Sequence, residues 1–281
     1  MSETSAWLTV EQRNVPLILS LPHTGIDIPL QCREGLVSLD LARKDADWWI
    51  DKLYIFARDL GATFVHTAIS RTVIDVNRHP SGVSLYRGQA TTELCPTTTF
   101  DGEPLYRSGR APDAAAVAER RKLYFDPYHA ALTHEITRLR ARHERIVLYD
   151  CHSIRSVIPR LFEGMLPNFN IGTNAGTSCA PQLAAAVEAT CRSDQFTFVA
   201  NGRFKGGWIT RSFGAPEKGV HAVQMELACR GYMREVPGAV SERDWPTPWD
   251  EAYAAPIQKK LRGVLEACIA FATPKRNEDG R

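Results

Sequence analysis

Residues 17–25 read LILSLPHTG, a short apolar run that stops at a proline, a histidine and a glycine. A second run, IVLYDCHS at residues 146–153, also carries a histidine near its end. Short apolar runs bounded by proline, glycine or serine are typical of buried strands in an α/β sheet. Ligand sites in such sheets lie just beyond the carboxyl ends of the strands. We therefore expect His23 and His152 to lie at a functional site, and not merely to hydrogen-bond a loop.

The rest of the chain alternates between helical and extended patterns. Apolar residues recur at helical spacing in residues 39–60, 113–143, 181–191 and 245–272. Further extended runs occupy residues 62–66, 67–78, 196–200 and 220–227. Strands that alternate with helices predict an α/β fold of three layers, αβα. We expect one catalytic domain over residues 1–273, followed by a polar tail at 274–281.

Three stretches rich in proline, glycine and small polar residues separate these elements, at residues 79–112, 153–179 and 202–219. Long loops in compact domains usually serve a function. We therefore predict that the first two cross the active face. The third is rich in glycine and carries Arg211, which could close over a ligand; a surface salt bridge is the alternative for that residue.

Composition narrows the class of partner. Hydrophobic residues make up 44% of the chain, charged residues 23%, and the net charge is +2, which gives no basic footprint for nucleic acid. No apolar run approaches the roughly 20 residues of a membrane span, and residues 1–5 do not resemble a signal peptide. Seven scattered cysteines fit reduced thiols. We predict a cytoplasmic protein that acts on a small molecule, with no nucleic-acid or membrane partner and no signal for a particular oligomeric state.

Two histidines in such positions favour a metal-binding site. Catalytic zinc takes three protein ligands, drawn from histidine and carboxylate, and leaves a fourth position for water. His23 and His152 would supply two of them. We favour Asp47 as the third. Asp47 and Asp51 lie one turn apart on the predicted helix and so share a face, and Asp47 is nearer the helix start, where it could turn toward a strand end. Helix capping or exposure to solvent would account for most of the other nearby acids, which are Asp27, Asp45 and Asp51.

A water molecule at such a metal needs a base, and a carboxylate within hydrogen-bond reach is the usual one. Glu226 is our candidate. Strand alternation over residues 220–227 places Gln224 and Glu226 on the same face. An acid on an otherwise apolar strand is costly to bury without a partner, so a structural ion pair is the rival explanation.

Residues 70–78, SRTVIDVNR, carry a cluster of charged and polar side chains. If this stretch is a strand, alternation places Arg71, Asp75 and Asn77 on one side, with Arg78 at the end. Guanidinium groups bind carboxylates in a bidentate fashion. The cluster therefore predicts a substrate that carries one or two carboxylates, and surface salt bridges are the alternative.

Five motifs occur in a fixed order along the chain. They are PHTG at 22–25, DWWIDKL at 47–53, SR at 70–71 with DVNR at 75–78, DCHS at 150–153, and GGWITR at 206–211 leading to QMEL at 224–227. Each motif alone is weak evidence. Together they resemble the N-formylglutamate amidohydrolase family, also called N-formylglutamate deformylases, over most of the chain.

The resemblance implies a mixed-sheet αβα fold similar to that of zinc-dependent exopeptidases of the carboxypeptidase kind, a phosphorylase/hydrolase-like architecture. It also implies hydrolysis of N-formyl-L-glutamate to formate and L-glutamate in histidine degradation. The cofactor would be one divalent metal ion, with zinc expected, held by His23, Asp47 and His152. Glu226 would deprotonate the attacking water, and Arg71 would polarise the formyl oxygen.

The same resemblance assigns substrate-binding residues. Asn77 and Arg78 are similar to the carboxylate-binding Asn-Arg pair of the carboxypeptidases, and Arg211 would join them in holding the glutamate carboxylates. The chain departs from the carboxypeptidases because no His-x-x-Glu follows its first strand; Asp27 lies four residues beyond the first histidine instead. The third metal ligand therefore stays open between Asp47 and Asp27.

Three alternatives remain from the sequence. The protein could hydrolyse another N-acyl amino acid, or a peptide that ends in a free carboxylate. It could also be a non-catalytic carboxylate-binding protein in which the histidines are structural. A thiol mechanism through Cys151 is disfavoured, because Cys151 and the adjacent His152 would point to opposite faces of a strand.

Overall fold

One mixed sheet organises the part of the chain that the computed structural model describes, which is residues 7–85, 88, 90–236, 238 and 240–273. From edge to edge the strand order is β1-β3-β2-β4-β7-β5-β6. β3, β2, β4 and β7 are mutually parallel, whereas β1 is antiparallel to β3 and β5 is antiparallel to β7. The strands are β1 (Leu8–Glu11), β2 (Leu17–Leu21), β3 (Thr63–Thr67), β4 (Ile146–Ile154), β5 (Phe169–Gly172), β6 (Phe198–Ala200) and β7 (Val220–Ala228).

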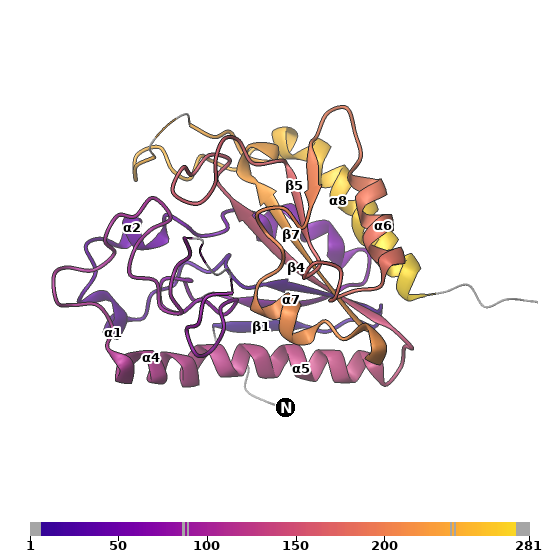
Figure 1. Ribbon diagram of the computed structural model, residues 1–281, viewed down its shortest axis with the longest axis horizontal. Coiled ribbons are helices and arrows are strands. Elements are labelled where there is room, and N and C mark those ends of the chain that lie inside the picture. Colours follow the sequence, from indigo (N-terminus) through magenta and orange to yellow (C-terminus); the bar gives the residue numbers. More distant parts are fainter. Residues whose placement is uncertain (1–6, 86–87, 89, 237, 239, 274–281) are drawn as a thin grey trace, which may run out of the picture.

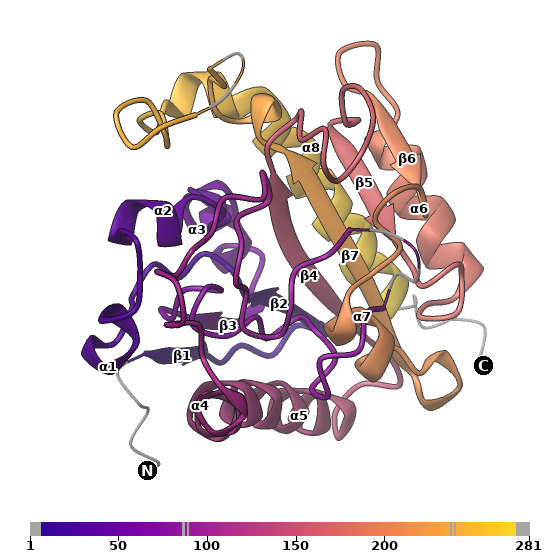
Figure 2. The same cartoon turned by 60° about the vertical axis from the view of Figure 1, so that its left-hand side comes forward.

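Helices cover both faces of this sheet, as Figures 1 and 2 show. A continuous rod of α4, η2 and α5 lies along one face, while α6 and α8 pack on the other. The helices are α1 (Leu30–Arg33), α2 (Leu39–Arg43), α3 (Ile50–Leu53), η1 (Ile55–Arg58), α4 (Ala114–Arg120), the π-helix η2 (Arg121–Phe125), α5 (Asp126–Arg140), α6 (Pro181–Cys191), α7 (Trp208–Phe213), η3 (Pro216–Lys218), η4 (Cys229–Gly231) and α8 (Glu251–Ala272).

Strand alternation divides the core into two halves. In β2, Leu17 and Leu19 pack into the core beneath α6 and α8, whereas Ile18 packs into the core beneath α5. In β4, Tyr149 joins the first half and Leu148 the second. Successive side chains of a strand point to opposite faces, so each strand contributes to both layers. The expected mixed α/β architecture is confirmed.

Several predicted elements match the structure closely. α6 has the predicted bounds, and the predicted helix over 113–143 exists as α4, η2 and α5 in succession. Asp113 caps it, because its side chain accepts a hydrogen bond from the backbone N–H of Ala116. β4 continues to Ile154, so His152 lies inside the strand and not beyond it.

The predicted helix over residues 39–60 is wrong. The chain forms α2, α3 and η1 there, with an irregular turn between α2 and α3. In that turn the backbone N–H of Asp47 donates to the carbonyl of His23 at 2.9 Å, and Trp49 adopts the left-handed conformation with φ 64°. In a helix the Asp47 N–H would bond a carbonyl four residues earlier. Here it bonds His23 instead, so the chain is not helical at this position. Asp47 and Asp51 therefore do not share a helix face.

The predicted strand over residues 67–78 is also wrong. β3 ends at Thr67, and the chain then turns, with Val73 N–H bonded to the carbonyl of Ser70. Asp75 N–H bonds the carbonyl of Leu94 at 2.7 Å, which belongs to the long loop and to no strand. The side chains of this segment converge because of the loop's path, and not because of strand alternation.

Other segments hold elements that periodicity did not reveal. β1 precedes the first predicted strand, β5 lies inside the predicted loop 153–179, and α7 lies inside the predicted loop 202–219. α8 begins at Glu251, later than residue 245, because Asp250 caps it by accepting from the N–H of Tyr253. The polar tail at 274–281 and the first residues 1–6 lie outside the described part of the chain. No helix within that part has the length and apolar character needed to cross a membrane.

Candidate active site

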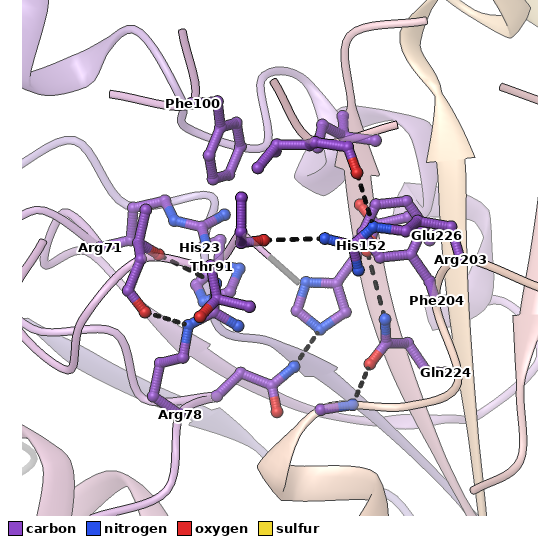
Figure 3. A pocket seen from close by; sticks show the side chains of 16 residues that line it. His23, Arg71, Arg78, Thr91, Phe100, His152, Arg203, Phe204, Gln224 and Glu226 are labelled. Carbon is purple, nitrogen blue, oxygen red and sulfur yellow. Dashed lines mark hydrogen bonds between the residues drawn. The ribbon is translucent and has the colours of Figure 1, made fainter. Parts of the chain in front are cut away.

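A cavity lies over the carboxyl ends of β2, β4 and β7, where the long loops cross them (Figure 3). Strand-end residues form its floor, and residues from the loops form its walls. The side chains and backbone that line it belong to His23, Arg71, Asn77, Arg78, Ala90, Thr91, Thr92, Phe100, His152, Ile154, Leu161, Arg203, Phe204, Gly207, Gln224 and Glu226. The two histidines that the sequence singles out thus share one cavity.

Both histidines face Asp47. His152 Nδ1 lies 3.1 Å and His23 Nδ1 lies 3.7 Å from the same carboxylate oxygen of Asp47. The two imidazole rings are 4.8 Å apart, and all three side chains are buried. Cys151 points to the opposite face and packs in the core under α8, where burial raises its thiol pKa well above the usual range.

Polar side chains around the two histidines contact the Nε2 atom of each imidazole. His23 Nε2 lies 2.7 Å from a carboxylate oxygen of Asp75, and His152 Nε2 lies 2.9 Å from Asp150. The Asn77 side-chain nitrogen also contacts His152 Nε2 at 2.8 Å. Metal-binding histidines commonly pair their other nitrogen with a carboxylate, which fixes the ring orientation. The arrangement leaves both Nδ1 atoms directed at Asp47.

These residues fit a divalent cation. The ligand atoms of His23, Asp47 and His152 all lie within 4.8 Å of one another. His23 Nδ1 and the Oδ1 atom of Asp47 are buried and have no hydrogen-bond partner among the described residues. Buried polar atoms are normally satisfied, and two histidines with one carboxylate is a ligand set that zinc uses. The group could therefore hold a metal ion.

The alternative ligand Asp27 does not reach this group. Its side chain is exposed, and its backbone pairs with Ile69 outside the cavity. Asp51 is also exposed, on α3. Asp45 accepts a 2.6 Å hydrogen bond from the backbone N–H of Phe100 and is directed to that loop. Of the acids that the sequence offered, only Asp47 meets both histidines.

Arg71 lies beside the group formed by Asp47 and the two histidines. It donates to Asp75 at 2.7 Å, and its Nη1 lies 3.7 Å from Asp47. Burial would lower the pKa of this guanidinium, but Asp75 and Asp47 outweigh that effect and raise it. Its guanidinium carbon lies 4.8 Å from the ring centre of Phe100. Arg71 is therefore a fixed, buried positive charge in the cavity wall.

Glu226 lies next to His152. The two residues are partners in the parallel register of β4 and β7, so their side chains leave the same face of the sheet. Burial raises the pKa of Glu226 to about 7, although His152 acts in the opposite direction. Gln224 donates to its carboxylate at 3.2 Å. A carboxylate with such a pKa can both accept and return a proton near neutral pH.

Asn77 and Arg78 both line the cavity, but their contacts differ. The Asn77 side chain accepts from the N–H of Ile209 at the start of α7 and contacts His152, so it braces the site. Arg78 donates to the carbonyl and hydroxyl of Thr92, at 3.2 and 2.9 Å. Its side chain is 21% exposed, which leaves part of the guanidinium open to the cavity.

Arg211 and Arg203 differ in their relation to the cavity. Arg211 lies on α7, its Nε donates to the carbonyl of Gly206, and it is not among the described residues that line the cavity. Arg203 does line it. Arg203 donates to the carbonyl of Leu161 at 2.8 Å and to that of Ala90 at 3.0 Å, so it links the two long loops above the floor (Figure 3).

Comparison with known proteins shows to which family the chain belongs. A sequence model of N-formylglutamate amidohydrolases matches residues 15–233. The chain belongs to the N-formylglutamate amidohydrolase family. It is 44% identical over 273 residues to the N-formylglutamate deformylase of Pseudomonas putida, covering 95% of this chain and 97% of that protein. It is 48% identical over 265 residues to the corresponding protein of Pseudomonas aeruginosa, covering 94% and 96%.

Solved structures agree on the fold of this family member. An N-formylglutamate amidohydrolase from Ralstonia eutropha superposes with a TM-score of 0.76 at 23% identity, covering 95% of this chain and 99% of the other. A gene product of Agrobacterium tumefaciens gives 0.68 at 19% identity, covering 94% of both chains. At these identities the likeness concerns the fold alone.

Arg203 and Phe100 are two of the cavity residues that the sequence does not predict. Both come from long loops, where no periodicity indicates which side chains point inward. The outer partners Asp75 and Asp150 were part of recognised motifs, but their pairing with the histidines was not predicted. An acid two residues before His152 on the same strand face was the available signal for Asp150.

Proposed function

We propose that this protein is a metal-dependent amidohydrolase that converts N-formyl-L-glutamate to formate and L-glutamate. One observation supports the proposal: the two histidines of a group that could hold a divalent cation line one cavity, together with the buried acid Glu226 and several arginines. Two relatives of similar length, each more than 40% identical, are named N-formylglutamate deformylases. A substrate with two carboxylates and a small acyl group matches this combination of charges.

We propose zinc as the metal. His23 and His152, each through Nδ1, and Asp47 would hold it, which agrees with the orientation that Asp75 and Asp150 impose on the two rings. A zinc ion bound there supplies Lewis acidity towards the formyl carbonyl and towards water.

Protein side chains carry the remaining steps. Glu226 takes a proton from the water that attacks the formyl carbon. As the C–N bond breaks, Glu226 returns that proton to the departing amine nitrogen, so the leaving group is the neutral amine of glutamate. Arg71, held by Asp75, is placed to donate a hydrogen bond to the formyl oxygen as negative charge develops on it.

The test measures formate release from N-formyl-L-glutamate, with N-acetyl- and N-succinyl-L-glutamate as competing substrates. Untagged protein with its metal content determined is compared with a sample stripped of metal by a chelator. We expect rapid formate release that disappears with the metal and returns when zinc is added. Protein that contains the metal but releases no formate would refute the substrate; release by verified metal-free protein would refute the metal.

Carboxylate binding gives a second prediction. We propose that Arg78 and Arg203 hold the glutamate carboxylates, because both line the cavity. Hydrogen bonds to charged groups contribute about 1.5–3 kcal/mol, so Arg203→Ala is expected to raise KM for N-formyl-L-glutamate about 10- to 100-fold. Arg211→Ala, on α7 outside the cavity wall, is expected to change KM less than about threefold.

Steady-state kinetics with both variants decides between the two arginines. A large rise in KM for Arg211→Ala, with Arg203→Ala close to wild type, would restore the prediction made from the sequence. Asn77 belongs to the same proposal as a substrate-binding residue, although its contacts with His152 mean that its removal would also disturb the site.

Three wider assignments complete the proposal. The reaction would serve histidine degradation in the cytoplasm. Residues 1–273 would act as one catalytic domain. The fold would be similar to that of zinc-dependent exopeptidases, in keeping with a mixed sheet that carries its polar site at the carboxyl ends of parallel strands.

A further inference from the structure

A short turn over residues 98–104 is held more firmly than an ordinary loop. Thr98 and Pro104 form an antiparallel bridge, and Gly102, with φ of 94°, allows the chain to reverse. Thr99 N–H bonds the carbonyl of Glu103 at 2.9 Å. The turn therefore has its own backbone hydrogen bonds, although it lies within a long loop.

Buried charges fasten this turn to the rest of the protein. Lys44 contacts Asp101 at 2.7 Å and Glu103 at 2.6 Å, and Arg155 contacts Asp101 at 2.6 Å. Both cationic side chains are more than nine-tenths buried. Asp45 accepts a hydrogen bond from the backbone N–H of Phe100, the residue before Asp101, at 2.6 Å. Moving the partly exposed Asp101 and Glu103 away would leave the buried cations Lys44 and Arg155 without their closest negative partners, so these contacts hold the turn in position.

The residue so fixed is Phe100. Its ring lines the cavity and is buried in a small core cluster with Ile154, Ile158 and Leu166. It also lies against the guanidinium of Arg71, 4.8 Å from ring centre to guanidinium carbon. An aromatic ring in this position both orients the arginine and closes the space beside it.

Figure 3 shows how this position relates to the rest of the site. Phe100 and Arg78 lie on opposite sides of His23, with Arg71 between them at one wall. A substrate that places a carboxylate at Arg78 and its amide at the histidines must direct its acyl group away from Arg78. In the proposed reaction Arg71 donates to the formyl oxygen, so the acyl group would lie beside Arg71 and next to the Phe100 ring, which is 4.8 Å from the guanidinium carbon.

We infer that Phe100, whose ring the charged turn holds in place, is the residue that limits the acyl group to formyl. This inference rests on the proposed function and adds the determinant of acyl specificity. A formyl group has only a hydrogen where acetyl has a methyl. One such group in a shaped pocket changes selectivity about 10- to 200-fold, which is the range that a single ring can control.

The test compares Phe100→Ala with Phe204→Ala. Phe204 is the matched control, because it is a phenylalanine that lines the same cavity but packs on Phe162 and Arg203 instead of Arg71. We measure kcat/KM for N-acetyl- and N-formyl-L-glutamate with metal-loaded protein. We expect the acetyl-to-formyl ratio to rise at least 10-fold in Phe100→Ala, and to stay within about threefold of wild type in Phe204→Ala.

Phe100→Leu covers the case in which the alanine variant fails to fold. The smaller but apolar side chain keeps the core contact, and the ratio is expected to rise by an intermediate amount. A ratio unchanged in a folded Phe100 variant, or an equal rise in Phe204→Ala, would overturn the inference.

Calorimetric binding separates this inference from the proposed function. Relative affinities of the two N-acyl-glutamates are measured for metal-loaded Glu226→Gln with and without Phe100→Ala, because hydrolysis by the active protein would consume the formyl compound during the measurement. A wild-type protein that hydrolyses neither compound refutes the proposed function, while the affinity ratio still tests Phe100. A wild-type protein that releases formate, with a Phe100→Ala variant whose affinity and kinetic ratios do not change, refutes this inference alone.

Discussion

Glu226→Gln is expected to lower kcat for N-formyl-L-glutamate by about 100- to 10,000-fold, the usual contribution of a positioned general base. Glutamine keeps the shape of the side chain and its place opposite His152 in the β4–β7 register, but it cannot take a proton from water. Metal content is expected to stay at the wild-type level, because Glu226 is outside the His23, Asp47 and His152 group. Turnover and metal stoichiometry are measured on the same preparation.

Glu135→Gln provides the matched control. Glu135 is also a buried glutamate, but it lies on α5, where it contacts Gln12 and Arg138 and not the cavity. This variant is expected to keep the wild-type kcat. Near-normal turnover by Glu226→Gln with bound metal would show that another group is the base.

Asp75→Asn is expected to lower the free energy of unfolding by about 3–5 kcal/mol, the cost of breaking a buried charge pair by removing one partner. Asp75 is fully buried and accepts hydrogen bonds from His23, from Arg71 and from the backbone N–H of Asn77. Burial would raise its pKa, but His23 and Arg71 outweigh this effect and hold the pKa well below its usual range. An asparagine would leave Arg71 without its closest negative partner.

The same variant is expected to weaken metal binding about 10- to 100-fold, because Asp75 orients the His23 ring. Urea unfolding gives the stability change, and titration of the metal-free protein gives the affinity. Asp59→Asn serves as control: Asp59 pairs with Arg262 at 3.7 Å but is 79% exposed, so its loss is expected to cost less than about 1 kcal/mol. A loss of similar size in the two variants would contradict the role given to Asp75.

The sequence predicts the framework of this fold well, for reasons visible in particular elements. β2 and the first half of β4 are apolar runs because helices cover both faces of the sheet there. α6 has Pro181 at its first position, and Asp113 caps the start of α4, so the sequence carries a local signal for the start of both helices. The two histidines lie close together because His23 follows β2, His152 lies near the end of β4, and these two strands are parallel neighbours.

Segments shaped by distant contacts are the ones that the sequence does not predict. The turn that presents Asp47 depends on a backbone bond to His23, and the path of residues 70–78 depends on a bond between Asp75 and Leu94. Neither partner can be identified from local periodicity. Arg203 and Phe100 come from loops whose inward-facing residues are fixed by charges and carbonyls elsewhere in the chain.

The parallel register of β4 and β7 has a consequence for how this protein can change over time. His152 and Glu226 are neighbours across two central strands, and a shift of β7 by one residue would turn Glu226 to the opposite face of the sheet, away from His152. The relative position of these two side chains therefore cannot change in small steps, because it is fixed by the pairing of the two strands. Phe100 and Arg203, by contrast, stand on loops outside the sheet. Descendants of this chain can therefore acquire new substrates by exchanging loop residues while inheriting the hydrolytic centre intact.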